Sequence, residues 1–564
     1  MKEIFRLIPP QYRRKCISVA LLVPVKALLN LVGVAALLPV MMLVLQPEKL
    51  QSSAFGVYIS RMGIAPGRSF AMLVVLLVIV LLVIKTILSL WITNYQNRFL
   101  LSLYKNLSSR MFVSLYSRGL IYVKNNNSSK LSFNIVGVCY NFVMGYLGGW
   151  MRLIGELVFA ICLLAALLIY SPYATLLSLG AFLPVMLLYI LAVRRPLGNM
   201  SKKENDLRRE QNKLLYEAFR GYSEVQINDA FPDIRERFEQ GLDTISRYRV
   251  RTGLIQSIPS YLLELAVVLI VAVLMLFSVN ASDPQSILFL SLFAVAMLKM
   301  LPTIRSIISS ISALNVTEYT KEVISDINTR GEYTCPERAE EVEPMKFERE
   351  ISVRNLSFRF DDADGYVLEN LNLSIRKGER FGIMGRTGAG KTTLFNLLLG
   401  LYHPTEGGIY VDSQLLTPEN MPSWHKLIGY VPQDVFIADA SVLQNVALGV
   451  EPSKIDRQRV EEALRQASLE EFIAELPEGL DTRIGEAGSK ISGGQRQRLG
   501  IARALYKKAE VLFFDEATSS LDSQTEAEVN KAISALSSEH KELTIIVISH
   551  RESTMEFCDR IFRI

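Results

Sequence analysis

Gly385-Arg386-Thr387-Gly388-Ala389-Gly390-Lys391-Thr392 is the stretch that decides the fold of this chain. It follows an apolar run at 380 to 384 and leads into 393 to 400, which is also rich in apolar residues. We therefore expect a strand, a glycine-rich turn and a helix. The pattern G-x-x-x-x-G-K-[ST] is typical of a P-loop, in which backbone N–H groups and a helix N-terminus surround a polyphosphate. Lys391 is expected to reach the outer phosphates and Thr392 to bind Mg²⁺. The glycines alone would fit a simple reversal of the chain, but the Lys-Thr pair favours nucleotide binding.

Length and composition predict a protein with a membrane part and a soluble part. The chain has 564 residues, a net charge of +5 and 50% hydrophobic residues, so at least two domains are expected. Apolar residues concentrate before about residue 312. The basic residues lie mainly between apolar runs, which favours a role in membrane orientation over nucleic-acid binding. The cysteines are odd in number and lack metal-ligand spacing, so we expect free thiols. They are Cys16, Cys139, Cys162, Cys335 and Cys558.

Six apolar runs reach or approach the length of about 20 residues that a helix needs to span a bilayer. They lie at residues 17 to 45, 70 to 93, 141 to 170, 173 to 193, 257 to 279 and 286 to 311. The first has no small-residue cleavage site before it and is expected to be a retained helix. Thirteen basic residues lie between residues 194 and 251 and six between 95 and 140, against three in the loop between the first two runs. This bias places both termini and the two long loops in the cytoplasm.

The two long cytoplasmic loops are expected to be helical. Apolar residues recur at three and four spacing in Leu207 to Phe219 and in Ile234 to Tyr248, which predicts that membrane helices continue into the cytosol. Breaks fall at Asn125 to Ser129 and at Asn228 to Pro232. A break at the tip of a helical hairpin is suited to a short docking element, and a solvated loop is the alternative.

Residues 331 to 350 are polar and acidic, which predicts a linker. Strands and helices are expected to alternate from residue 351 to Ile564. Within this part, a fully apolar strand at 511 to 514 ends in Asp515 and Glu516. One carboxylate at such a strand end can steady Mg²⁺ while the next orients or deprotonates the attacking water. The alternative is a solvated carboxylate pair at the surface.

Ser492-Gly493-Gly494-Gln495 is predicted to begin another helix. Two glycines and a hydroxyl at a helix start form a second phosphate-binding turn. Because the domain already has a P-loop, self-association would explain why a second such turn is present.

Taken together, these motifs resemble those of ATP-binding-cassette (ABC) exporters of the half-transporter kind, with the type IV exporter fold. The resemblance covers nearly the whole chain, with a six-helix membrane domain ahead of the nucleotide-binding domain, and the motif set is highly specific because it recurs in the family's order. They are the P-loop, Gln433 in Tyr430-Val-Pro-Gln, Gly485-Glu486-Ala-Gly488, Ser492 to Gln495, Asp515-Glu516, Ser520-Leu-Asp522 and His550. The resemblance implies an α-helical six-span membrane domain at 1–330, a linker at 331–350 and an α/β P-loop nucleotide-binding domain at 351–564.

The resemblance also implies roles for single residues, with ATP and Mg²⁺ as cofactors. ATP would be held by Phe360, stacked on adenine, and by Gly385, Arg386, Thr387, Gly388, Ala389, Gly390, Lys391, Thr392 and Thr393. Mg²⁺ would be bound by Thr392, Gln433 and Asp515. Glu516 would polarise the water, Gln433 would sense it and His550 would contact the γ-phosphate. Ser492, Gly493, Gly494 and Gln495 would act in trans, since the nucleotide-binding domains of such families dimerise head to tail.

Three features depart from the family pattern. Phe360 stands where many relatives have Tyr, and Ile491 replaces the usual Leu. Relatives usually continue beyond the position of Ile564, so either the subunit is short or a tail is missing. Because the catalytic carboxylates and phosphate-binding residues are intact, a symmetric homodimer is the simplest assembly, with a heterodimer as the alternative.

Ionisable residues inside the apolar runs are candidates for the substrate site. They are Lys26, Lys85, Arg152, Glu156, Glu264, Lys299 and Arg305. Arg152 and Glu156 are four residues apart and suited to pair with each other, and Lys26 or Arg305 can reach the membrane surface. Lys85 and Lys299 lack a nearby partner in the sequence, and we expect them to line a cationic cavity for an anionic amphiphile.

These observations predict an ATP-driven exporter or flippase of a bacterial inner membrane that moves an anionic, lipid-linked substrate out of the cytoplasmic leaflet by alternating access. Features such as Lys85-Thr-Ile-Leu and Met300-Leu-Pro302 resemble those of lipid-linked oligosaccharide flippases. The alternatives are an exporter of peptides or other hydrophobic compounds, a non-pumping ATP-gated regulator, and an importer.

Overall fold

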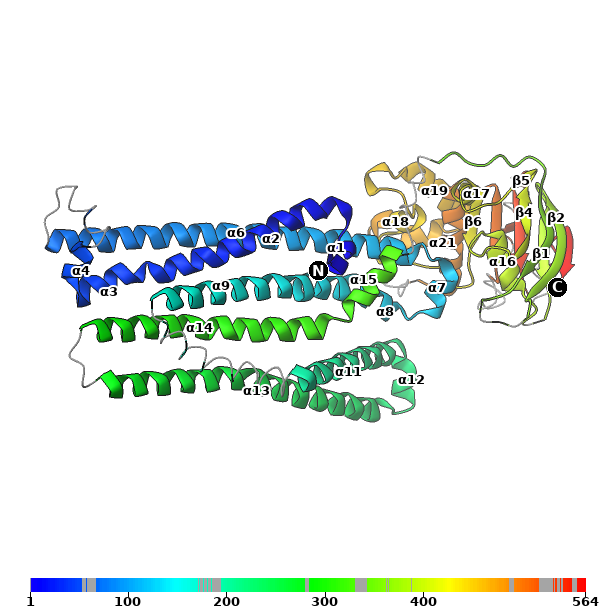
Figure 1. Ribbon diagram of the computed structural model, residues 1–564. Coiled ribbons are helices and arrows are strands. Elements are labelled where there is room, and N and C mark those ends of the chain that lie inside the picture. The colour runs from blue at the N-terminus through cyan, green and yellow to red at the C-terminus, as the bar shows by residue number, and fades with distance from the viewer. Residues whose placement is uncertain are drawn as a thin grey trace. The chain divides into compact units, whose positions relative to one another are not determined.

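The structure is a computed structural model, and it divides the chain into two compact units. It describes residues 2–52, 57, 67–170, 172, 176, 180, 184, 194–278, 284–329, 342–361, 363, 365–386, 388–485, 491–516, 531, 533–534, 538, 541–549 and 555–564. Unit 1 comprises residues 1–117 and 126–333, and unit 2 comprises 118–125 and 334–564. Figure 1 labels many of the elements of both.

The described residues of unit 1 form helices without strands. These are α1 (Lys2–Leu7), α2 (Pro10–Ala35), α3 (Leu37–Leu45), α4 (Pro47–Ser52), α6 (Arg68–Tyr116), α8 (Ser128–Phe133), α9 (Gly148–Tyr170), α11 (Arg194–Arg220), α12 (Tyr222–Ile227), α13 (Phe231–Ser278), α14 (Pro284–Thr317) and α15 (Thr320–Thr329). Two π-helical turns, Asn134–Val138 and Asn141–Leu147, join α8 to α9. Buried apolar residues of α2, α9 and α14, among them Ala27, Phe159 and Met300, pack into one core.

Three helical stretches among the described residues are long and apolar enough to cross a membrane: Pro10–Val44, Arg68–Tyr116 and Ser128–Ile169. They contain the predicted run at 70 to 93 and all but the last residue of the runs at 17 to 45 and 141 to 170. The predicted runs at 257 to 279 and 286 to 311 fall largely in α13 and α14. The run at 173 to 193 lies for the most part outside the described residues, so the presence of six membrane spans stays a prediction.

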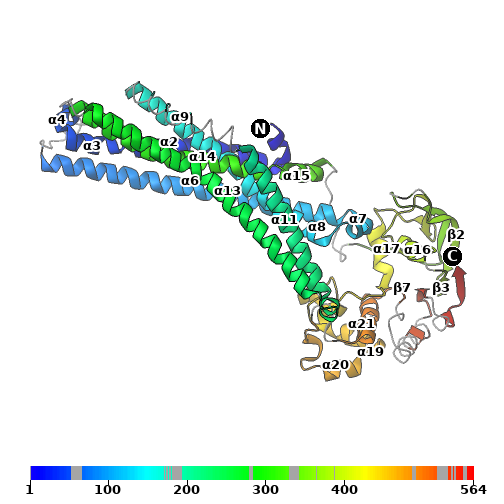
Figure 2. The ribbon, with the colours of Figure 1, turned by 90° about the horizontal axis from the view of Figure 1, so that it is seen from below.

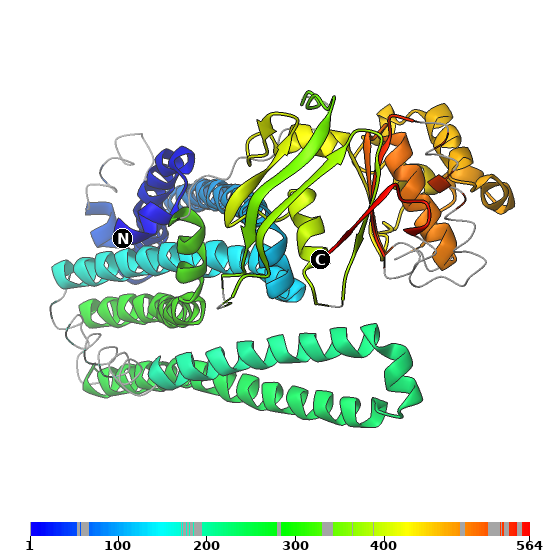
Figure 3. The same cartoon turned by 90° about the vertical axis from the view of Figure 1, so that its right-hand side faces the viewer.

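The predicted extension of helices beyond the apolar runs is confirmed. Helix α6 has 49 residues and α13 has 48; at about 1.5 Å per residue each is more than twice as long as the hydrocarbon core of a bilayer, roughly 30 Å. Helices α11 and α13 pack side by side as a hairpin, with α12 at its tip (Figures 2 and 3). Both predicted breaks are also present, since α7 (Gly119–Asn125) ends at the first and α12 ends just before the second.

Unit 2 contains two sheets. The antiparallel sheet has the order β2-β1-β4-β5 and the parallel sheet the order β6-β7-β8-β3-β9. The strands are β1 (Glu350–Phe358), β2 (Leu368–Arg376), β3 (Arg380–Met384), β4 (Glu406–Val411), β5 (Gln414–Leu415), β6 (Ile428–Val431), β7 (Val511–Asp515), β8 (Thr544–Ile548) and β9 (Arg560–Arg563). In addition to α7, the described α-helices of unit 2 are α16 (Lys391–Leu398), α17 (Met421–Leu427), α18 (Val442–Val446), α19 (Arg457–Gln466), α20 (Glu470–Glu475) and α21 (Gly493–Tyr506).

Two hydrophobic cores stabilise unit 2. The first holds the inner faces of α18, α19 and α21. The second lies between the antiparallel sheet, α16, α17 and β3, and its fully buried Trp424 donates its indole N–H to the Leu398 carbonyl at 3.0 Å. Strands β7 and β8 are buried almost throughout, which is why their sequences read as continuous apolar runs instead of alternating patterns.

Helix α7 belongs to unit 2 although it follows α6 directly in the chain. Its Leu120 and Ile121 pack against the second core. Of the five cysteines, the four described ones, Cys16, Cys139, Cys162 and Cys558, are free thiols as predicted.

Candidate functional site

The glycine-rich turn connects buried β3 to helix α16, as the sequence predicts. Phe381 and Ile383 anchor β3 in the core, and the chain then turns through Gly388 and Gly390, whose φ angles are +84° and +94°. These are left-handed conformations that glycine adopts without steric cost. A Cβ on Gly390 would also come within 2.9 Å of the Leu368 side chain. Glycine is therefore required where the turn meets the helix.

Lys391 lies across the inside of this turn. Its side chain is buried, with 5% of the residue exposed. The ammonium group donates to the carbonyl oxygens of Gly385 at 2.9 Å and Arg386 at 3.0 Å. These two acceptors compensate the cost of burying the charge, so a positive charge is held at the centre of the turn, at the N-terminus of α16. Thr392 is exposed and Thr393 half-buried on the first turn of α16, and Thr387 lies outside the described residues.

Asp515 and Glu516, at the end of β7, lie at the same edge of the parallel sheet as the glycine-rich turn. Asp515 pairs with Ile548 of β8, and Ile548 pairs with Ile383 of β3. Since carboxyl ends of parallel strands meet at one edge, Asp515 and Glu516 are brought to the side of the sheet where the turn begins. Glu516 has a φ of +45°, a rare conformation for a residue with a side chain and one that is concentrated at functional sites.

Asp515 lies in a half-buried, partly acidic environment. Burial and then the neighbouring charge of Glu516 raise its pKa, while Lys124 of α7 opposes the shift. Tyr430 of β6 is close enough to sense Asp515: burial, followed by the Asp515 charge, raises its pKa to about 12. The tyrosine therefore stays protonated near neutral pH.

Gln433 follows β6, and helix α21 holds the backbone around it. Gln497 of α21 is 3% exposed and donates to the Gln433 carbonyl at 2.7 Å and to the Pro432 carbonyl at 3.3 Å. Arg503, three residues before the end of α21, donates to the Phe436 and Asn445 carbonyls at 2.9 Å each. The segment bearing Gln433 is thus attached to α21, the helix that begins with Gly493 and Gly494.

The predicted helix start at Ser492 is confirmed. The Ser492 hydroxyl accepts from the Gln495 N–H at 3.2 Å, and the Gln495 side-chain oxygen accepts from the Ser492 N–H at 2.8 Å. This reciprocal capping box fixes the first turn of α21. Ile491 and Gly494 are buried there, whereas Ser492 is exposed. The Ser492 turn is built on the first core and the Lys391 turn on the second.

Phe360 is half-buried after β1, with its ring at right angles to those of Phe358 and Tyr402, at centroid distances of 5.1 and 6.0 Å. His550 lies outside the described residues. Sequence reasoning missed Gln497 and Arg503, because a polar residue in a helix gives no sign of the carbonyl that it will meet.

The oxygen donors predicted for Mg²⁺ suit that ion. Thr392, Gln433 and Asp515 offer a hydroxyl, an amide oxygen and a carboxylate, and Mg²⁺ prefers hard oxygen ligands completed by water and phosphate. Asp515 ends β7 and Thr392 follows β3, and both strands pair with the central β8. No group of three or more His, Cys, Asp and Glu side chains in the described part of the chain forms an all-protein metal site, so phosphate or water ligands would have to complete the coordination.

A second polar cluster lies among the apolar helices of unit 1. Glu156 of α9 interacts electrostatically with Lys26 of α2 and forms side-chain hydrogen bonds with Ser306 and Thr303 of α14. The contacts of Glu156 are thus with α2 and α14, and the expected pairing with Arg152 is not among them.

Lys85 of α6 and Lys299 of α14 belong to the same region. Their charges interact with each other, and Lys85 also interacts with Lys26. The Lys85 side chain crosses α2 closely enough that a Cβ on Gly33 would lie 3.4 Å from its Cε. The ion pairs between described residues include neither Lys85 nor Lys299, whereas Lys26 has Glu156 nearby.

Comparisons with known proteins cover most of the chain. The family model for the ABC transporter transmembrane region matches residues 31–301, and the ABC transporter model matches residues 368–519. The ATP-dependent lipid A-core flippase of Ralstonia nicotianae is 31% identical over 470 residues, 81% of this chain and 76% of that protein. The protein of the same name from Cupriavidus metallidurans is 32% identical over 483 residues, 83% of this chain and 78% of its own.

A solved structure of a bacterial Atm1-family ABC exporter with ATP bound superposes with a TM-score of 0.76, covering 98% of this chain and 94% of that chain at 21% sequence identity. This likeness shows that the fold is that of an exporter. With the two family models and the relatives, it shows that the chain belongs to the ABC transporter family, as a helical membrane domain fused to a nucleotide-binding domain that couples ATP hydrolysis to transport.

Proposed function

We propose that this chain is a half-transporter that flips an amphiphilic, anionic lipid-linked substrate out of the cytoplasmic leaflet. The observation that carries the substrate class is the membrane cluster, in which Lys85 and Lys299 interact while Glu156 engages Lys26. The relatives named lipid A-core flippases support the same class. An exporter of peptides or other hydrophobic compounds has no need for two lysines without an acidic partner among apolar helices, where each central charge costs about 3 kcal/mol.

In this proposal the membrane domain spans 1–330, the linker 331–350 and the nucleotide-binding domain 351–564, which lies in the cytoplasm with both termini. The membrane is a bacterial inner membrane. The basic residues of the two long loops, six at 95–140 and thirteen at 194–251, supply the positive charge that keeps these regions on the cytoplasmic side.

We assign ATP to the Lys391 turn. Residues 385–393 would surround the phosphates, Phe360 would stack on adenine, and Thr392, Gln433 and Asp515 would bind Mg²⁺. Glu516 would orient the attacking water and His550 would contact the γ-phosphate. Support comes from the buried lysine inside the turn, the shared strand edge and the strained backbone of Glu516.

Two copies of the chain would complete each ATP site. The Ser492 turn exposes a hydroxyl at the N-terminus of a 14-residue helix, and it stands on a different core from the Lys391 turn. We propose that the Ser492 to Gln495 turn of one subunit closes over ATP held by the other. Binding that favours the closed dimer would shift the equilibrium of the membrane helices, because a ligand stabilises the state it binds better.

The tip of the α11–α13 hairpin supports a homodimer. Large apolar side chains surround α12 and are exposed in the single chain: Phe219 at 76%, Tyr222 at 64%, Ile227 at 81% and Phe231 at 57%. Helix α7, the other short helix at a hairpin tip, packs its half-buried Leu120 and Ile121 against the second core of unit 2. We propose that α12 docks in the same way on the nucleotide-binding domain of the partner. A heterodimer with a related chain is the alternative.

The experiment that tests the function uses the full-length protein in liposomes with a fluorescent phosphate-bearing lipid in the outer leaflet, on the side of accessible nucleotide-binding domains. We expect loss of that lipid from this leaflet only with ATP and Mg²⁺, and none with Glu516→Gln, which should still bind ATP. Transport of a neutral lipid at the same rate would contradict the proposed substrate class, and ATP binding without any movement would favour a regulator that does not pump.

A further inference from the structure

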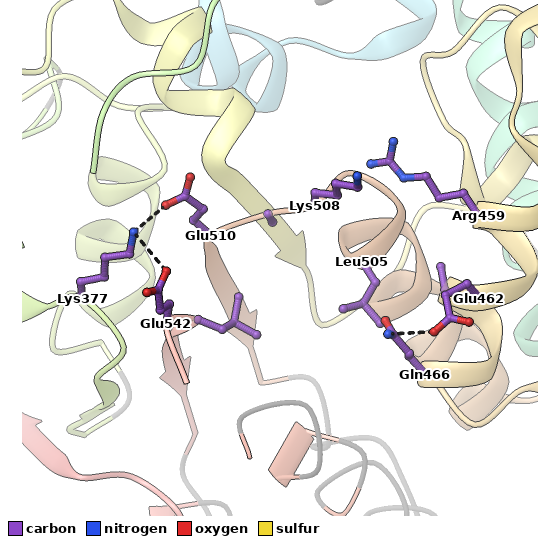
Figure 4. Close-up of a pocket in the computed structure, with 11 residues that line it drawn as sticks. Lys377, Arg459, Glu462, Gln466, Leu505, Lys508, Glu510 and Glu542 are labelled. Atoms are coloured by element: carbon purple, nitrogen blue, oxygen red, sulfur yellow. Dashed lines mark hydrogen bonds and ion pairs between the residues drawn. The ribbon is translucent and has the colours of Figure 1, made fainter. Parts of the chain in front are cut away.

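Unit 2 has a pocket of about 520 Å³ at the edge of the parallel sheet opposite the Lys391 turn. Its β-sheet wall consists of residues that precede strands: Lys377 before β3, Glu510 before β7, and Glu542 and Leu543 before β8. The turn with Lys391 follows β3, so the pocket and the nucleotide turn lie at opposite strand ends. Helix α19 and the end of α21 form the other wall, seen on the right of Figure 4.

The acidic groups that line this pocket are already engaged. Lys377 contacts Glu510 at 3.1 Å and Glu542 at 4.0 Å, and the same ammonium donates to the Phe347 carbonyl at 2.9 Å. On the helical wall, Glu462 accepts from Gln466 at 3.1 Å. It also pairs with Arg465, the next cation along the outer face of α19.

Two cations of the pocket are left without an acidic partner. Arg459 and Lys508 appear in none of the ion pairs between described residues, and Figure 4 shows the Lys508 ammonium and the Arg459 guanidinium pointing toward one another. The Arg459 guanidinium lies over the Tyr506 ring, 4.8 Å from its centroid. Its Nε atom is shielded from solvent and has no hydrogen-bond partner within the described structure.

An anion in the pocket could contact both cations at once. Lys508 is exposed and Arg459 is half-buried, and the shielded Nε donor of Arg459 costs free energy as long as it is unpaired. The Lys508 backbone has a φ of +57°, a left-handed conformation just after the end of α21. A guanidinium beside an ammonium is suited to bind a phosphate, because arginine offers paired N–H donors and lysine a point charge.

We propose that this pocket binds a small phosphate monoester, with Arg459 and Lys508 on the phosphate and the apolar lining of Leu505, Ala509 and Leu543 around the organic part. Its volume is in the range of small-molecule sites. The site is regulatory, because its lining joins both cores of unit 2: Leu543 and α19 pack in the first, while β3, preceded by Lys377, packs in the second. A ligand held by both walls stabilises one arrangement of them and thereby changes the rate of ATP hydrolysis.

The test uses the full-length protein in detergent or nanodiscs, with a non-hydrolysable ATP analogue and Mg²⁺ filling the nucleotide site so that phosphate cannot bind there. Calorimetry with phenyl phosphate should then show saturable binding. Arg459→Ala and Lys508→Ala should each weaken it by about ten- to a hundredfold. Arg459→Lys should restore part of the loss. Lys541→Ala, an exposed lysine outside the pocket, should bind as the wild type does.

ATPase measurements at saturating ATP provide the second readout. Without phenyl phosphate, the pocket variants should hydrolyse ATP at the wild-type rate and melt at the wild-type temperature. With it, the wild-type rate should change and the Arg459→Ala rate should not. Absence of saturable binding, binding by both alanine variants as tight as that of the wild type, or binding with no effect on hydrolysis would each overturn the proposal. If inorganic phosphate bound as tightly as phenyl phosphate, the apolar lining would have no role in binding.

Discussion

Gln497→Leu should raise the Mg²⁺ concentration that ATP hydrolysis requires. The substitution keeps the size of a side chain that is 3% exposed and removes the donor to the Gln433 and Pro432 carbonyls. Each lost hydrogen bond has a net value of about 0.5 to 1.5 kcal/mol, and a buried carbonyl left unpaired costs about 1 to 3 kcal/mol. Since about 1.4 kcal/mol is tenfold in an equilibrium constant, we expect the ordered position of Gln433 to be populated roughly tenfold less.

The assay is steady-state ATPase activity against free Mg²⁺ at saturating ATP. Half-maximal activity should need about ten times more Mg²⁺, and high Mg²⁺ should restore most of the rate, because the defect lies in placing a proposed ligand. Gln458→Leu, on the exposed face of α19, is the matched control and should behave as wild type. An unchanged Mg²⁺ dependence, with activity falling only in step with the folded fraction, would refute the reasoning.

Three further predictions follow from the described contacts. Ile227→Asp should abolish coupled hydrolysis while shifting the melting temperature little, since surface changes usually alter stability by about 0.5 kcal/mol or less; unchanged hydrolysis would count against docking of α12. Lys85→Gln with Lys299→Gln should remove stimulation of the ATPase by anionic lipid and keep the basal rate, and stimulation that persists would argue against the cavity. His425 has its pKa lowered chiefly by burial, while its bond to the Leu399 carbonyl at 2.8 Å opposes the shift. The folded state therefore disfavours protonation, so thermal stability should fall as the pH drops below about 6.5, and His425→Gln should flatten that slope in calorimetric melts.

Local patterns were sufficient for much of the fold. The glycine turn, the helix start at Ser492, the breaks near Asn125 and Asn228 and the helical loops all appear as predicted, because each depends on residues that are neighbours in the chain. Glycine conformations, caps and the three- and four-residue spacing of apolar side chains act over one or two turns.

Contacts between distant segments could not be predicted in this way. Gln497 meets a carbonyl 64 residues away, and Glu156 faces α2 and α14 in place of Arg152, its neighbour one turn back. Such partners depend on how helices pack, and the same local pattern is compatible with many packings.

The amino-acid sequence by itself determined that this protein binds a nucleotide and has membrane helices, since a P-loop and long apolar runs carry their physical meaning locally. Only the tertiary structure decided which charges stay together and which stay apart. Lys85 and Lys299 come from separate helices, and Arg459 and Lys508 line one pocket although 48 residues separate them in the chain. The cost of a buried charge depends on what surrounds it in space, and that surrounding exists only once the chain has folded.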